Sequence, residues 1–164
     1  MFYDKNHVIS SPVSVDYDTA GDNVLITPGE VIWVKRLIMV CTEVSAGSSI
    51  ATLKLRNVDD TSSVTLGTFT VPAAIALNAV RYVDLIKPST TGAAGADSTT
   101  SLPTTVYTTT GKGPIRVVPG QELEVTSDGV GTAGIFNVYV EYGPEGFNEK
   151  TSLFTPTELT FTAS

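Results

Sequence analysis

The sequence has few charged residues, and lysine and arginine are the scarcer kind. Charged side chains make up 16% of the 164 residues and the formal net charge is −7, whereas about 25% is usual in globular domains. So few cations argue against general nucleic-acid binding, which needs them to neutralise phosphates, and against docking on an anionic membrane. No run approaches the ~20 apolar residues of a spanning helix. The first residues lack a basic and then apolar leader, so we expect synthesis in a cytoplasm without secretion.

The chain also has only one cysteine and one histidine. Cys41 cannot form an intrachain disulfide, and with one histidine it cannot supply the usual zinc ligands. Because Cys41 lies in a strongly apolar segment, we predict a buried, inert thiol. His7 lies near the N-terminus, where a solvated or interface histidine is expected rather than a catalytic base. We therefore predict no enzymatic activity, no cofactor and no metal.

One acidic segment partly matches a calcium-binding loop. Asp16, Asp18 and Gly21 stand at the right spacing for the start of such a loop. Ala20 and Thr27 occupy positions where the loop needs oxygen ligands. We interpret the segment as an acidic turn between strands, and a weakly held cation at an interface is the alternative.

Threonine, valine, glycine and alanine replace the missing charge, and β-branched residues favour strands. Pro12 interrupts the first apolar run and indicates an edge position. Residues 72–78 are the only plausible helical turn. Short strands separated by Gly/Pro turns predict an all-β sandwich or barrel. The expected strands cover residues 8–15, 23–27, 31–44, 50–57, 64–71, 80–86, 106–110, 115–118, 122–127 and 133–142.

The segment 31–44 carries the strongest apolar signal, with apolar residues at both parities, as in a strand covered on both faces. Lys35 and Arg36 interrupt it, where the strand bends or passes from one sheet to another. We predict that Trp33 belongs to the core. The alternative is a sugar-stacking platform that combines Trp33 with tyrosines. The tyrosines concerned are Tyr82, Tyr107, Tyr139 and Tyr142.

The chain divides into a β-sandwich domain at residues 1–143, in which residues 1–7 could act as an arm, and a C-terminal extension at residues 144–164. Residues 87–105 form a long low-complexity loop inside the domain. The extension is rich in aromatics, unlike a disordered tail, so we expect it to be buried either as a last strand or as an intersubunit arm. The predicted interface residues are Phe2, Tyr3, Phe147, Phe154, Leu159 and Phe161.

Three stretches carry a family resemblance: Val24–Val34, Val117–Val125 and Gly134–Tyr142. Each of the first two holds a Pro-Gly-polar turn between strands, and the third is a long aromatic strand. This arrangement resembles viral jelly rolls, in particular the capsid decoration (auxiliary head or cement) proteins of tailed bacteriophages, and β-sandwich domains of phage fibres.

The resemblance implies an all-β, jelly-roll-like antiparallel sandwich of about 8–10 strands with little or no helix. It also implies a virion protein, made in the host cytoplasm, that stabilises a phage capsid through protein–protein contacts. Its partners would be the major capsid protein and further copies of itself, often as a homotrimer, without nucleic acid or membrane. The alternative is a carbohydrate- or receptor-binding head domain of a phage fibre.

Overall fold

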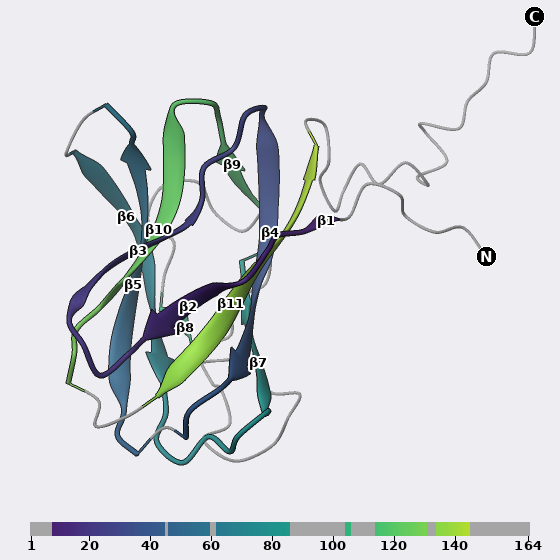
Figure 1. The fold of residues 1–164 in the computed structure, drawn as a ribbon. Coiled ribbons are helices and arrows are strands. Elements are labelled where there is room, and N and C mark those ends of the chain that lie inside the picture. The colour runs from purple at the N-terminus through teal and green to yellow at the C-terminus, as the bar shows by residue number, and fades with distance from the viewer. Residues whose placement is uncertain are drawn as a thin grey trace, which may run out of the picture.

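The computed structural model describes residues 8–44, 46–59, 62–85, 104–105, 114–130 and 134–144. Every regular element in these residues is a β-strand and none is a helix (Figure 1). The strands are β1 (Val8–Ile9), β2 (Val13–Asp16), β3 (Gly21–Ile26), β4 (Ile32–Cys41), β5 (Ser49–Asn57), β6 (Ser63–Val71), β7 (Val80–Asp84), β8 (Thr104–Thr105), β9 (Ile115–Val117), β10 (Gln121–Ser127) and β11 (Ile135–Pro144). The predicted all-β fold is confirmed, and the strand expected at 106–110 lies outside the described residues.

The strands form two antiparallel sheets that pack face to face (Figure 1). Sheet A has the order β1-β11-β4-β7, with β2 also paired to β11 and β9 to β4, and sheet B has the order β3-β10-β5-β6-β8. The pairs are nested, since β5 pairs with β6, β4 with β7, β3 with β10 and β2 with β11. Successive pairs alternate between the sheets, which is the jelly-roll topology. The short β1 and β2 lie at an edge beside Pro12, as predicted.

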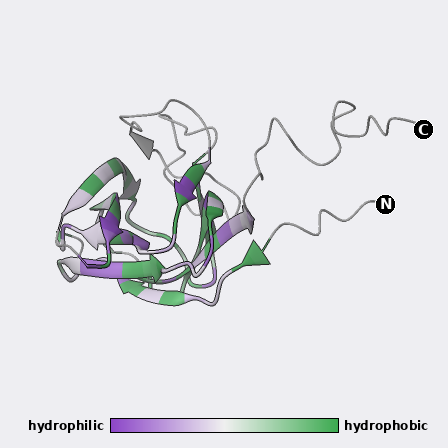
Figure 2. Cartoon of the chain, turned by 90° about the horizontal axis from the view of Figure 1, so that it is seen from above, coloured by the Kyte–Doolittle hydropathy of each residue, from purple (hydrophilic) through white to green (hydrophobic). Residues whose placement is uncertain are grey.

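The core lies between the sheets, and alternate residues of each strand enter it. Figure 2 shows hydrophobic and hydrophilic residues following one another along the strands, as expected for half-buried antiparallel sheets. Within this core Tyr17 packs edge-on against Phe136 and Phe69, with ring centroids 5.5 and 6.4 Å from its own. Burying one such large apolar side chain contributes about 1.5–3 kcal/mol. The thiol of Cys41 is buried in this core as predicted.

A β-bulge in β4 contradicts one of the two expectations for Lys35 and Arg36, namely that the strand passes from one sheet to another there. Val34 pairs with Tyr142 and Arg36 with Glu141, so Lys35 is an extra residue and β4 stays in sheet A. The bulge reverses the parity of the inward face. Residues on both sides of it therefore face the core, namely Ile32, Val34, Leu37, Met39 and Cys41.

The same bulge explains why the core prediction for Trp33 is wrong. With Ile32 and Val34 inside, Trp33 lies on the outer face of sheet A and is only half-buried. Simple alternation from Met39 and Cys41 predicts that it lies on the inner face, because the apolar residues at both parities are equally compatible with a strand covered on both faces and with a bulge.

The helical turn expected at residues 72–78 is also wrong. This segment crosses from β6 in sheet B to β7 in sheet A, and Ile75 fills the core at the crossing. Ala74 and Asn78 both have φ of 63°, in the left-handed region that a right-handed helix cannot contain. The N–H of Asn78 donates a 2.8 Å hydrogen bond to the carbonyl oxygen of Cys41, which holds the crossing against β4.

Candidate protein-interaction surface

Four loops meet at one end of the sandwich, the lower end in Figure 1. The strand register brings the ends of β2 and β4 beside the start of β11, and the end of β10 beside the starts of β3 and β5. We call this end the loop end. Its loops comprise residues 17–20, 42–48, 72–79 and 128–134, of which residues 45 and 131–133 lie outside the described residues.

The loop after β10 is held against two of its neighbours. The N–H of Asp128 donates to the carbonyl oxygen of Ile50 at 3.1 Å, and Oδ2 of Asp128 accepts from the N–H of Ile50 at 3.0 Å. Gly129 has φ of +65°, and a Cβ there would lie 2.5 Å from the backbone nitrogen of Ala20. Only glycine fits such a close approach, so this loop and the loop after β2 are packed together.

The loop after β6 is tied to the end of β4 and to the loop that follows it. Besides the hydrogen bond from Asn78 to Cys41, the N–H of Ala73 donates to Oγ of Ser48 at 3.3 Å. The N–H of Cys41 in turn donates to the carbonyl oxygen of Ala79 at 2.9 Å. The loop end is therefore a connected framework rather than a set of independent loops.

Three of these loops expose a large apolar side chain. Val44 is 49% exposed, Leu77 55% and Val130 73%, each on a different loop. Ile50, at the loop end of β5, is 51% exposed. Single exposed apolar residues are ordinary on a protein surface, and these four are notable because they lie at the same end of the sandwich. We call Val44, Leu77 and Val130 the apolar tip.

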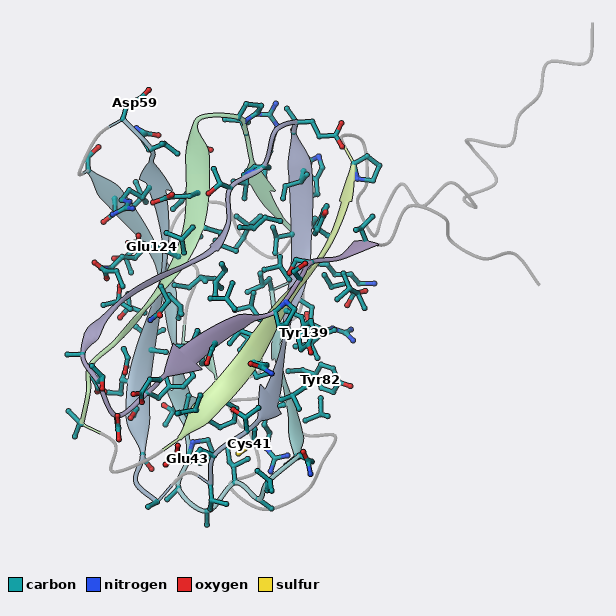
Figure 3. All side chains as sticks on the ribbon, in the orientation of Figure 1. Cys41, Glu43, Asp59, Tyr82, Glu124 and Tyr139 are labelled. Atoms are coloured by element: carbon teal, nitrogen blue, oxygen red, sulfur yellow. The ribbon has the colours of Figure 1, made fainter. Side chains whose placement is uncertain are left out.

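The charges around the apolar tip are all of one sign. The four loops contain Asp18, Glu43 and Asp128 and no lysine or arginine, and Asp16 ends the adjoining β2. In Figure 3 Glu43 is labelled near the lower end of the sandwich, close to Cys41. The loop end therefore presents apolar side chains on an acidic background.

The predicted acidic turn is formed at Asp16–Thr19. Oδ1 of Asp16 accepts from the N–H of Asp18 at 3.1 Å, and the hydroxyl of Thr19 lies 3.1 Å from Oδ2 of Asp16 and from Oδ1 of Asp18. A side-chain hydrogen bond between the two carboxyl groups lowers the pKa of Asp16 and raises the pKa of Asp18. Nowhere in the described ranges do three His, Cys, Asp or Glu side chains form a group that could hold a metal ion.

The residues of the alternative aromatic platform lie only in part on one face. Trp33, Tyr82 and Tyr139 lie half-buried on the outer face of sheet A, whereas Tyr142 faces inward and packs against the core. Tyr107 lies outside the described residues.

The structure leaves the predicted interface residues untested. Phe2, Tyr3, Phe147, Phe154, Leu159 and Phe161 lie outside the described residues, as do His7 and all but the last two residues of the 87–105 loop. Sequence reasoning missed the apolar tip altogether. Its only signal was the presence of a large apolar residue in a turn, such as Val130 between Gly129 and Gly131.

No protein-family model, curated protein or solved structure matches this chain. The resemblance to phage decoration proteins therefore stays a prediction. Among the residues that the structure describes, no helix is long and apolar enough to cross a membrane.

Proposed function

We propose that this chain is a virion structural protein that decorates a bacteriophage capsid and stabilises it through protein–protein contacts made by the loop end. The observation that carries the proposal is the apolar tip, three exposed apolar side chains on three interconnected loops. The jelly-roll fold and the low charge content are consistent with it.

The framework of the loop end favours binding because the loops are already held in place. A surface that is ordered before it meets its partner loses less conformational entropy on binding. The pairs Asp128–Ile50 and Asn78–Cys41 order two of the loops that carry the apolar tip. Ordered apolar side chains near the centre of an interface commonly supply most of its binding energy.

The charge of the loop end indicates the kind of capsid surface it would fit. Glu43, Asp128 and the Asp16–Asp18 turn surround the apolar tip without a cation in any of the four loops. Opposite charges steer association and disfavour wrong partners. The partner would therefore be a major capsid protein with an apolar depression rimmed by lysine or arginine.

Capsid stabilisation would follow from selective binding. A protein that binds the assembled shell, and not its dissociated subunits, stabilises the shell by mass action. Self-association into a homotrimer is part of the same proposal, because it would multiply the loop ends that engage the shell at once.

The test uses purified expanded heads of the encoding phage, assembled without this protein, to which the full chain is added. Co-sedimentation measures binding, and the temperature at which heads release DNA measures stabilisation. The triple variant Val44→Ser/Leu77→Ser/Val130→Ser should bind at least tenfold more weakly than the natural chain.

The matched control is Val58→Ser/Val64→Ser. These valines are 49% and 54% exposed, and they lie on the β5–β6 hairpin at the opposite end of the sandwich. The control should bind heads normally. Failure of the natural chain to bind heads would overturn the function, and equal binding by both variants would overturn the role of the loop end.

A further inference from the structure

The outer face of sheet A is built from rows of directly paired residues on three neighbouring strands. Ile38 of β4 pairs with Tyr139 of β11 on one side and with Tyr82 of β7 on the other. Directly paired residues share a face, so the two tyrosines flank Ile38 at two strand spacings, about 10 Å apart. Both are half-buried, and Figure 3 labels them in the part of sheet A around β4.

The next row is charged, and its positive and negative side chains lie next to one another. Arg36 pairs with Glu141 on one side and with Asp84 on the other. Its Nε lies 3.6 Å from Oε2 of Glu141, and Nζ of Lys35 lies 3.8 Å from Oε1 of the same carboxylate. The guanidinium also lies over the ring of Tyr82, 5.3 Å from its centroid, which holds that ring in place.

The row on the other side of the tyrosines adds apolar surface and one amide. Val40 pairs with Asn137 of β11 and with Val80 of β7. Ile38 and Val40 therefore stand next to each other on the outer face of β4, each at the middle of its row. An outward-facing surface of an antiparallel sheet is usually polar, so the apolar character of these two rows calls for a ligand.

We propose that this face of sheet A is a binding site for a neutral oligosaccharide. Two pyranose rings would lie against Tyr139 and Tyr82, because the C–H face of a sugar ring packs on an aromatic ring. The groups beside the rings suit sugar hydroxyls: Arg36 donates, Glu141 accepts and Asn137 does both. The site is separate from the loop end and does not depend on the proposed capsid function.

The charges of the face are the reason for choosing a neutral ligand. Arg36 and Lys35 both lie near Glu141, and Asp84 and Glu141 also have interaction partners. Arg116, the cation that pairs with Trp33 farther along this face, has an interaction partner as well. A sulfated, phosphorylated or nucleic-acid ligand would need a surplus of cations. The distance of 3.6 Å between Nε of Arg36 and Oε2 of Glu141 exceeds a hydrogen bond.

The experiment screens the full chain against an array of neutral and acidic oligosaccharides. The strongest neutral hit is then titrated into the chain while tryptophan fluorescence is recorded, because Trp33 is the only tryptophan and lies on this face. Tyr82→Ala and Tyr139→Ala should each weaken binding at least tenfold. Tyr82→Phe and Tyr139→Phe, which keep the ring, should stay within about threefold of the natural chain.

The control for an unrelated surface is the loop-end triple variant, which should bind the oligosaccharide normally. Circular dichroism and thermal unfolding show whether each alanine variant is folded, and either tyrosine alone tests the site if the alanine variant of the other does not fold. Binding of acidic glycans alone, or of none, would overturn the proposal. The proposal would also be overturned if the alanine variants still bound the glycan but had a different molar mass by light scattering. That result would make the face a contact between protein chains.

Discussion

The hydroxyl of Ser127 donates a 2.9 Å hydrogen bond to the carbonyl oxygen of Tyr17, which joins the end of β10 in sheet B to the residue that follows β2 in sheet A. The hydroxyl of Ser49, at the start of β5, donates to the same oxygen at 2.8 Å. Both serines are buried. One main-chain oxygen thus holds the two sheets together at the base of the loop end.

Removing these two donors should have a non-additive effect. Ser49→Ala leaves the carbonyl oxygen of Tyr17 with the Ser127 donor and should cost about 1 kcal/mol. Ser127→Ala should cost somewhat more, because the N–H of Gly129 also loses its acceptor at 3.2 Å. The double variant leaves a buried carbonyl without either donor and should exceed the sum of the single effects by about 1 kcal/mol. Urea unfolding measures all three, and strict additivity would show that the oxygen finds another donor.

The substitution Tyr17→Phe should make the folded protein more stable. Its side chain is buried between Phe69 and Phe136, and its hydroxyl has no hydrogen-bond partner within the described residues. Tyr17→Phe keeps the ring contacts and removes a buried polar group without a partner. We expect the free energy of unfolding to rise by about 1 kcal/mol. A loss of stability would mean that the hydroxyl makes a hydrogen bond after all.

Tyr17 should also make the stability of the folded protein depend on pH in the alkaline range. Burial raises the pKa of Tyr17 above its ordinary value of 10.0. Above about pH 10 the unfolded chain would lose this proton while the folded chain keeps it, so the folded state loses stability as the pH rises. The natural chain should lose more stability between pH 9 and pH 11 than Tyr17→Phe, as urea unfolding at each pH would show. Parallel curves would exclude Tyr17 as the cause.

Sequence patterns predicted the strands wherever alternation was regular. In β5 and β10 inward apolar residues alternate with polar ones, and each strand was placed to within a residue or two. Patterns failed where tertiary structure decides the backbone. The bulge at Lys35 reverses parity without changing composition, and it moved Trp33 from the expected core to the outer face.

The loop end shows the same limit. Residues 72–78 contain alanine, leucine and isoleucine, which are compatible with a helix, but the crossing between sheets and the hydrogen bond from Asn78 to Cys41 impose a left-handed backbone. The apolar tip and the Tyr139–Ile38–Tyr82 row depend on residues far apart in the sequence. The platform weighed as the alternative from the sequence contains two of the three residues of that row, and the pairing through Ile38 could come only from the register.

Replacing Ala74, which has a left-handed backbone, by glycine should stabilise the folded protein. A left-handed conformation costs a non-glycine residue about 1–2 kcal/mol, and Ala74 and Asn78 share the same φ of 63°. Ala74→Gly should therefore raise the free energy of unfolding by up to about 1 kcal/mol, less the greater entropy of glycine in the unfolded chain. Asn78→Gly is the matched control and should change little, because asparagine tolerates this conformation. Equal effects in thermal unfolding would contradict this explanation.

The outer face of sheet B carries a charge network whose members should not contribute equally. Glu124 is only 2% exposed, with Oε2 at 3.3 Å from Nε of Arg56 and Oε1 at 4.0 Å from Nζ of Lys54. Arg56 also binds Glu122, whereas Lys54 otherwise contacts only the half-exposed Asp22 in this network. Arg56 therefore neutralises two nearly buried carboxylates, Glu122 and Glu124. Lys54 approaches only Glu124 of these two, and it lies farther from Glu124 than Arg56 does.

Arg56→Met should consequently lower the melting temperature by about 5 °C or more, because it leaves Glu122 and Glu124 without their main counter-charge. Lys54→Met should lower it by less than about 2 °C, as for an exposed pair. Adding Glu124→Gln to the Arg56→Met background should recover part of the loss, since one of the uncompensated carboxylates is then gone. Scanning calorimetry at pH 7 measures all three variants. If Lys54→Met were the more damaging single substitution, Asp22 rather than Glu124 would be the carboxylate on which this face of sheet B depends.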